Sequence, residues 1–289
     1  MMNMVYRSYD DMANCIRRNL WKVPADVDLI VGVPRSGMMP ALMIAELLNK
    51  QCTDLDSFVC GRVMSYGSRG DMMRRGKPGK VVVIDDSVCS GLSLEKVREQ
   101  LVPLASMNEI SYGCVYAESE QAKQEVDFWF EDITAQGKTA YLKEWNILHL
   151  YRNRMKRSMW DIDGLLCKDP PDDRDRAAYE AYLPDAVPMV IPTNHIGALV
   201  TYRLEKYRSV TEDWLMRHGV DYGSLEMFNA PDRETRNASV SSARYKARLY
   251  GAASWAQMFV ESDMRQAERI FRYSGKPVYC YENGILYNT

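Results

Sequence analysis

The stretch VVVIDDSVCSGLS, residues 81–93, contains the pattern that decides the fold. Its first four residues are apolar and β-branched, which is typical of a strand buried inside a parallel sheet. Two adjacent carboxylates follow, then a loop of small residues, and then a sequence that favours a helix. Ligands of parallel sheets bind beyond the carboxyl ends of strands, where loops lead into helices that offer free N–H groups. The stretch therefore predicts an α/β fold with a binding site at this turn.

The first half of the chain repeats this alternation of strand and helix patterns. Short apolar runs typical of buried strands occupy residues 27–33, 80–85, 110–116 and 126–130. Apolar residues at helical spacing occupy residues 9–20, 38–50 and 92–101. This βαβ order predicts a doubly wound, mostly parallel sheet flanked by helices.

A second series of strand patterns begins after residues 151–158, which have no apolar periodicity. Its apolar runs occupy residues 158–163, 198–202, 257–262 and 276–281. No internal repeat is visible, so the halves are different domains rather than a duplication. We predict two α/β domains, residues 1–155 and 156–289, each with a mostly parallel sheet flanked by helices. Each half of a 289-residue chain is long enough to bury its own core.

Composition excludes several classes of protein. The 37 basic and 39 acidic residues give a net charge of -2, which argues against nucleic-acid binding because phosphate contacts need a basic face. The seven cysteines are scattered and never form a C-x-x-C pair, so neither a disulfide framework nor a zinc site is indicated, and a cytoplasmic location fits best. We see no targeting signal and no apolar run of about 18 residues that could span a membrane.

Residues 81–93 resemble the phosphoribosyl-diphosphate motif of type I phosphoribosyltransferases. The resemblance implies that Asp85 and Asp86 hold the ribose 2- and 3-hydroxyls. It also implies that a loop binds the 5-phosphate through backbone N–H and hydroxyl groups, and this loop comprises Ser87, Val88, Cys89, Ser90, Gly91 and Ser93. Cys89 stands where the family more often has Ser or Thr, a departure that removes one hydroxyl donor but leaves the rest of the loop.

The earlier turn VGVPRSGMMPA, residues 31–41, resembles the same family's diphosphate loop. The resemblance implies that Arg35, Ser36 and Gly37 line the leaving diphosphate beside Mg²⁺, where arginine offers charge and a planar set of donors. It further implies displacement at an anomeric carbon, in which positioning and charge stabilisation do most of the work. Members of this family often form dimers, so a homodimer is expected.

Between the two motifs, residues 61–79 are polar, glycine-rich and basic, which is typical of a loop over a site. The side chains in it that could close over the diphosphate are Arg62, Tyr66, Arg69, Arg74, Arg75 and Lys77. For any one of them, a solvated loop residue is an equally good interpretation.

The second half contains a pair of carboxylates in SMWDIDGLLC, residues 158–167. Asp161 and Asp163 follow a short apolar run, and Gly164 permits a tight turn that brings backbone amides close to an anion. Two carboxylates at this spacing can divide labour, one as nucleophile and Mg²⁺ ligand and the other as general acid and base. A D-x-D pair by itself is more often a surface turn.

This pair resembles the first motif of the haloacid dehalogenase superfamily, and later signatures occur in the expected order. The resemblance implies that Thr201 binds the transferring phosphoryl group and that Lys246 neutralises charge, although a plain surface lysine is the alternative. It implies that Mg²⁺ is bound by Asp161, Asp163, Glu261 and Asp263, and which of the last two is the principal ligand stays open.

The stretch from 201 to 227 also resembles the segment after the second motif of polynucleotide-kinase-type phosphatases in this superfamily. The short separation of Gly164 from Thr201 excludes a large inserted cap domain. The resemblance thus implies a haloacid dehalogenase-like Rossmannoid fold with a minimal cap and an open site.

The two resemblances together suggest a bifunctional enzyme. The first domain would transfer 5-phosphoribosyl from phosphoribosyl diphosphate to an acceptor, and the second would remove the 5-phosphate, leaving plain ribose. Tethering raises the effective concentration of the intermediate. A bacterial glycan hydroxyl is the favoured acceptor, because salvage of nucleobases normally keeps the 5-phosphate. The alternatives are a nucleobase phosphoribosyltransferase with a nucleotide phosphatase, and a non-catalytic sensor of phosphoribosyl diphosphate.

Overall fold

The computed structural model describes residues 4–64, 79–134, 140–149, 152–172 and 174–288. The chain divides into two compact units, Met1–Tyr141 and Leu142–Thr289. Strand β7 (Ala140–Lys143) spans the division. Within the described ranges, no helix combines the length and the apolar character that crossing a membrane requires.

The division falls upstream of the boundary that the sequence predicts at residue 155. The reason is that the segment after Tyr141 packs with the second unit. The hydroxyl of Tyr279 lies 3.5 Å from the Glu144 carboxylate, and the side chains of Ile147 and Met155 are fully buried. Helices α6 (Glu144–Ile147) and α7 (Arg152–Met155) therefore belong to the second unit.

The first unit is built on a five-stranded parallel sheet with the order β3-β2-β4-β5-β6. Its strands are β2 (Leu29–Gly32), β3 (Gln51–Asp54), β4 (Lys80–Val88), β5 (Glu109–Ala117) and β6 (Phe128–Asp132). The predicted strands of this half are confirmed, whereas β1 (Met4–Arg7) and β3 were not predicted. The strand order reverses between the neighbours β2 and β4, so the loops that follow these two strands diverge there.

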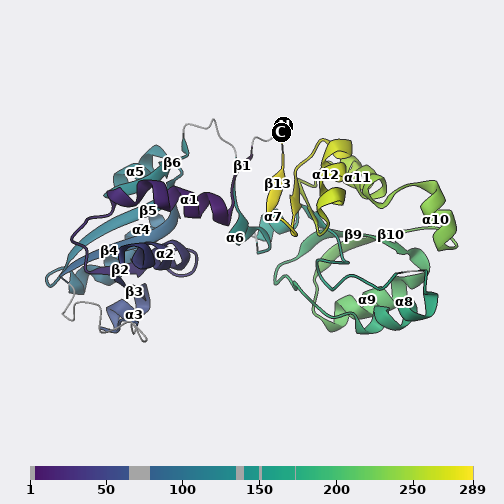
Figure 1. The fold of residues 1–289 in the computed structure, drawn as a ribbon, viewed down its shortest axis with the longest axis horizontal. Helices are drawn as coiled ribbons and strands as arrows, with labels where there is room; N and C mark the ends of the chain where they lie inside the picture. The colour runs from purple at the N-terminus through teal and green to yellow at the C-terminus, as the bar shows by residue number, and fades with distance from the viewer. Residues whose placement is uncertain (1–3, 65–78, 135–139, 150–151, 173, 289) are drawn as a thin grey trace. The chain divides into compact units, whose positions relative to one another are not determined.

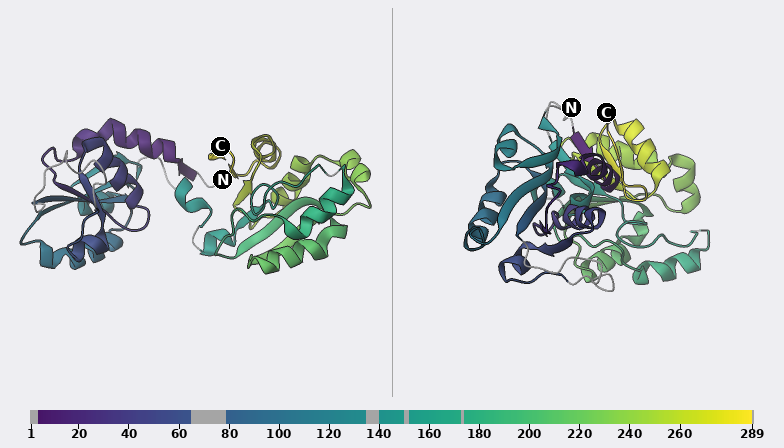
Figure 2. Two further views of the ribbon diagram at one scale, coloured as in Figure 1. Left: turned by 60° about the horizontal axis from the view of Figure 1, so that its bottom comes forward. Right: turned by 60° about the vertical axis from the view of Figure 1, so that its left-hand side comes forward.

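Helices cover both faces of this sheet (Figures 1 and 2). They are α1 (Tyr9–Asn19), α2 (Met38–Leu48), α3 (Leu55–Val59), α4 (Leu92–Leu101) and α5 (Glu120–Glu125), with single 3₁₀ turns at Leu20–Lys22 and Val102–Leu104. Alternate strand residues point to opposite faces. Val81 and Val83 thus pack with α3 and α4, while Val82 and Ile84 are buried on the face that α2 contacts.

The second unit contains a six-stranded sheet with the order β10-β9-β8-β11-β12-β13, parallel except for the last pair. Its strands are β8 (Ser158–Trp160), β9 (Ile196–Leu204), β10 (Tyr222–Phe228), β11 (Met258–Glu261), β12 (Val278–Cys280) and β13 (Ile285–Tyr287). The four predicted strands are confirmed. The edge strands β10 and β13 were not predicted, because half-exposed edge positions lack a continuous apolar run.

Helices α11 (Ser242–Ala252) and α12 (Met264–Ser274) cover one face of this sheet, and α8 (Arg176–Tyr182) and α9 (Arg208–Arg217) lie on the other (Figure 1). Helix α10 (Arg233–Ser239) and 3₁₀ turns at Leu183–Asp185 and Glu205–Tyr207 complete the unit. The strand order reverses between β8 and β11. The α/β class with mostly parallel sheets is thus confirmed in both units.

Gly37 is required by a close backbone approach in the first unit. A Cβ atom on Gly37 would lie 2.7 Å from the carbonyl oxygens of both Val33 and Ile84. We expect Gly37→Ala to lower the free energy of unfolding of this unit by about 1–3 kcal/mol, because backbone atoms cannot move aside as a flexible side chain can. Gly79→Ala is the matched control, since its Cβ would meet only Asp28 at 3.6 Å. Equal urea midpoints for both variants would contradict this expectation.

Candidate functional sites

The turn after β2 lies against strand β4, where the strand order of the first unit reverses. The N–H of Val33 donates to the carbonyl of Ile84 over 2.9 Å, and a Cβ on Gly37 would come within 3.0 Å of the Asp85 Cα. The turn that contains Arg35, Ser36 and Gly37 therefore lies against the end of β4. Arg35 is exposed and Ser36 is half-buried, and the peptide bond between Pro34 and Arg35 is cis.

The two carboxylates lie within β4 rather than after it, because this strand extends to Val88. Asp86 is buried, with 4% of its surface exposed, and Asp85 is half-buried. The backbone N–H of Asp86 donates to Oδ1 of Asp85 over 2.8 Å. Neighbouring strand residues point to opposite faces of the sheet, so the side chains of Asp85 and Asp86 would approach a shared ligand from different sides.

The loop after these carboxylates leads directly into helix α4. Gly91 has a φ of 77° and precedes the first turn of α4, where no side chain caps the helix. Ser119 donates a hydrogen bond to the carbonyl of Cys89 and so anchors the loop. Cys89, Ser90 and Ser93 are exposed, Ser87 is half-buried, and the side chain of Val88 belongs to the core. Val88 can therefore serve a ligand only through its backbone.

The basic loop is only partly described. The N–H of Arg62 donates to the carbonyl of Ser57 over 2.8 Å, and its own carbonyl accepts a hydrogen bond from Thr53. The other predicted side chains of this loop lie outside the described residues, and they are Tyr66, Arg69, Arg74, Arg75 and Lys77.

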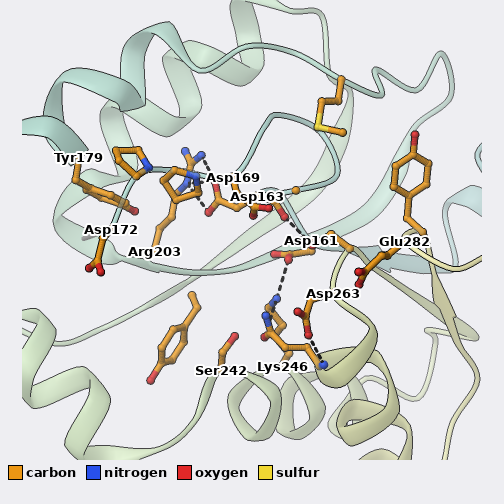
Figure 3. A pocket seen from close by; sticks show the side chains of 18 of the residues that line it. Asp161, Asp163, Asp169, Asp172, Tyr179, Arg203, Ser242, Lys246, Asp263 and Glu282 are labelled. Atoms are coloured by element: carbon orange, nitrogen blue, oxygen red, sulfur yellow. Dashed lines mark hydrogen bonds and ion pairs between the residues drawn. The ribbon is translucent and has the colours of Figure 1, made fainter. Parts of the chain in front are cut away.

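The second unit contains a cavity of about 750 Å³ at the reversal between β8 and β11 (Figure 3). Asp161, Asp163, Lys246 and Asp263 line it, whereas Thr201 and Glu261 are fully buried behind its wall. The segment between β8 and β9 also contributes to the wall, through residues 169–172 and Tyr179. The predicted residues thus converge from three strand ends and one helix.

Lys246 lies between two carboxylates at the floor of this cavity. Its Nζ is 2.8 Å from Oδ2 of Asp161 and 2.7 Å from Oε2 of Glu261, and 2% of its side chain is exposed. Burial opposes the charge of Lys246, but the attraction of the two carboxylates raises its pKa. Lys246 is therefore a buried cation that neutralises charge, and the alternative of a plain surface lysine is wrong for its position.

The predicted residues Asp163 and Thr201 are held by Arg203, which the sequence analysis missed. The guanidinium group of Arg203 donates to both oxygens of Asp163, with distances of 2.5 to 3.2 Å. Its backbone N–H donates to Oγ1 of Thr201 over 3.2 Å. Arg203 is 2% exposed. A signal was present, because residues two apart on a strand share a face, which places Arg203 beside Thr201.

Glu261 and Asp263 differ in their freedom to bind a metal. Glu261 has no exposed surface, and its oxygens accept hydrogen bonds from Lys246 and from the backbone N–H groups of Ser262 and Asp263. Asp263 lines the cavity and caps α12 by accepting from the N–H of Gln266. Of the two acids, Asp263 is the one placed to reach a ligand.

The cavity carries an excess of negative charge. Burial and the neighbouring Glu261 carboxylate raise the pKa of Asp161 well above its usual range. Burial, together with Asp163 and Asp263, also raises the pKa of Asp169. Among the described residues, no three acidic, histidine or cysteine side chains are already grouped to hold a metal. A Mg²⁺ ion at this place would therefore need waters and substrate oxygens as ligands in addition to one or two carboxylates.

Comparison with protein-family models and with curated proteins finds no match for this chain. Among solved structures, it is similar to a xanthine-guanine-hypoxanthine phosphoribosyltransferase from Helicobacter pylori, at 16% identity with a TM-score of 0.38, over 50% of this chain and 95% of that one. A purine phosphoribosyltransferase from Pyrococcus horikoshii is similar at 22% identity with a TM-score of 0.35, over 50% and 94%. An orotate phosphoribosyltransferase from Aeropyrum pernix is similar at 20% identity with a TM-score of 0.32, over 44% and 71%. Similarity at this level concerns the fold alone.

Removing the Lys246 charge should destabilise the second unit. We expect Lys246→Met to lower its free energy of unfolding by about 3–5 kcal/mol, because Asp161 and Glu261 would stay buried without their cation. Adding Glu261→Gln should restore part of the loss, since one of the two buried charges is then removed. Urea unfolding of both variants and the wild type measures this. If the double variant loses as much free energy of unfolding as the two single variants added together, Lys246 and Glu261 are not energetically coupled and this expectation is wrong.

Proposed function

We propose that this chain transfers a 5-phosphoribosyl group from phosphoribosyl diphosphate to an acceptor hydroxyl or nitrogen and then removes the 5-phosphate. One observation supports both halves of the proposal. In each unit the strand order reverses beside the strand that carries the acidic motif, which is where open parallel sheets bind their ligands.

The transferase step is assigned to the first unit. Asp85 and Asp86 would bind the ribose hydroxyls from β4, and the uncapped amino terminus of α4 would bind the 5-phosphate through backbone N–H groups. The turn that contains Arg35 would bind the diphosphate, which leaves as the acceptor oxygen or nitrogen attacks the anomeric carbon. Mg²⁺ bound to the diphosphate would neutralise part of its charge.

The phosphatase step is assigned to the second unit. An oxygen of Asp161 would attack phosphorus and form an aspartyl phosphate as the P–O bond to the sugar breaks, and the departing sugar oxygen would take its proton from the protonated form of Asp163. Water then attacks this phosphorus, Asp163 accepts the proton of the water, and inorganic phosphate leaves. Arg203 fixes the Asp163 carboxylate through its two-pronged contact. Lys246 offsets the negative charge that accumulates around Asp161.

Mg²⁺ in the second unit would be held by Asp161 and Asp263, which line the cavity. Arg203 donates to both oxygens of Asp163, whereas Lys246 donates to Oδ2 of Asp161, and Glu261 is buried. When bound, it would supply charge stabilisation to the phosphoryl oxygens. We expect Asp263→Asn to raise the Mg²⁺ concentration that gives half-maximal phosphate release by at least about tenfold. The exposed Asp213 on α9 provides the control Asp213→Asn, which should leave this concentration unchanged. An unchanged Mg²⁺ dependence in Asp263→Asn would remove Asp263 from the metal site.

The acceptor is proposed to be a sugar hydroxyl of a bacterial glycan, because removal of the 5-phosphate yields a plain ribofuranosyl group. The rival acceptor is a nucleobase, whose nucleotide product would be trimmed to a nucleoside. A third possibility is a sensor that binds phosphoribosyl diphosphate without reacting. The three differ in what is released and in which acceptor gains mass.

Mass spectrometry of the products separates these functions. Wild type and Asp161→Asn are incubated with phosphoribosyl diphosphate, Mg²⁺ and separate panels of glycan acceptors and nucleobases. We expect a glycan to gain a ribosyl unit with the wild type and a phosphoribosyl unit with Asp161→Asn, because the variant lacks the nucleophile. Asp86→Asn should release far less diphosphate with any acceptor. Reaction of nucleobases alone would favour the salvage enzyme, and binding without any release of diphosphate would favour the sensor.

A further inference from the structure

The wall of the second unit's cavity carries more carboxylates than cationic side chains. Among the described residues that line it, six are carboxylates and three are cationic. Two of these cations, Lys246 and Arg203, are committed to the floor carboxylates Asp161 and Asp163. Glu261, buried behind the wall, shares Lys246 with Asp161, whereas Asp172 is paired with Arg174 outside the wall. Adding Glu261 and leaving out Asp172 keeps the formal excess at three negative charges, and a bound divalent cation would still leave one.

The additional carboxylates lie around Asp161 rather than behind it. Figure 3 shows Asp172 and Glu282 on opposite sides of Asp161. Asp169 is beside the catalytic turn, since its Oδ1 would lie 2.9 Å from a Cβ on Gly164. Glu282 is fixed by the backbone N–H of Met264 at 2.9 Å. Asp172 is paired with Arg174, so Asp169 and Glu282 contribute most of the uncompensated charge.

The rest of the wall is suited to a ring that bears hydroxyl groups. Tyr179 and Tyr202 line the cavity, and the Arg236 guanidinium carbon lies 4.4 Å from the centre of the Tyr202 ring, which helps to fix that ring. Aromatic rings supply an apolar surface for the C–H face of a sugar. Ionised carboxylates only accept hydrogen bonds, so they match hydroxyl donors and mismatch other anions.

The net negative charge of this concave wall acts on the whole of an approaching substrate. Clefts concentrate the field of their charges, and like charges lower the rate of association. A substrate with a single phosphate monoester brings one anionic group, which the phosphatase step itself requires. A nucleic-acid end brings one more negative charge per nucleotide, which would lie against Asp169 and Glu282.

We propose that this cavity selects a phosphate monoester carried by an uncharged, hydroxyl-bearing ring, and that Asp169 and Glu282 exclude polyanionic substrates. The proposal rests on the phosphatase activity proposed above and names its substrate class. It assigns Asp169 and Glu282 the role of specificity determinants, outside the chemical step itself. It also separates this site from phosphatases that act on polynucleotide ends.

The test compares three kinds of substrate with the full-length protein in Mg²⁺ at low salt. They are p-nitrophenyl phosphate, ribose 5-phosphate, and a pair of trinucleotides, one phosphorylated at its 5′ end and one at its 3′ end. We expect kcat/KM for ribose 5-phosphate to exceed that for the trinucleotides by about 100-fold, within the range that electrostatic steering reaches. Added salt should narrow this ratio, because it screens the wall charges. The double variant Asp169→Asn/Glu282→Gln should lower the ratio of the two kcat/KM values by about tenfold, mainly by raising trinucleotide hydrolysis. The control Asp213→Asn should leave this ratio unchanged.

The outcomes distinguish the two levels of the proposal. If p-nitrophenyl phosphate is hydrolysed but the trinucleotides match ribose 5-phosphate, the specificity proposal is overturned and the phosphatase proposal stands. The same holds if the ratio is insensitive to salt in the wild type, a measurement that needs no variant to fold. If none of the three substrates is hydrolysed, both proposals fail together.

Discussion

Parallel strands cannot be joined by tight turns, and this constraint places both candidate sites. Each strand must be followed by a crossover, and the loops after two neighbouring strands separate only where the direction of crossing reverses. In the first unit this happens between β2 and β4, and in the second between β8 and β11. The first acidic motif lies within β4 and the second directly follows β8, so each lies beside the position where the strand order of its sheet reverses.

The two candidate sites would bind a phosphate in different ways. The first would use backbone groups, since Gly37 allows the turn after β2 to pack against β4 and the amino terminus of α4 after Gly91 has no side-chain cap. The second relies on buried charge, since Lys246 stays ionised only because Asp161 and Glu261 flank it. Backbone N–H groups suit a ligand that is held and released unchanged at its phosphate. A preorganised set of charges suits a bond that is made and broken at phosphorus.

Burial of charge also explains the division of labour among the acids of the second unit. Glu261 holds Lys246, and Arg203 holds Asp163, so neither acid is equivalent to the exposed carboxylates of the wall. Isolated charges would be costly to bury, and each is accompanied by an opposite charge and further hydrogen bonds. Asp161, Asp163 and Asp263 line the cavity, and in our proposal Asp169 and Glu282 set the electrostatic potential that a substrate meets.

The sequence by itself determined the α/β class and the central strands of both sheets, because apolar runs are local signals. The resemblance to the haloacid dehalogenase superfamily predicted that Asp161, Lys246 and Glu261 belong to one site. The sequence patterns missed the edge strands β3, β10 and β13, whose half-exposed positions have no continuous apolar pattern. Only the tertiary structure decided that residues 142–155 pack with the second unit and that Arg203 engages Asp163. It also decided that Glu261 is buried while Asp263 reaches the cavity. These facts depend on contacts between residues far apart in the chain. The spacing of residues along one strand or helix shows which of them share a face, but it does not identify the distant residue that packs against that face.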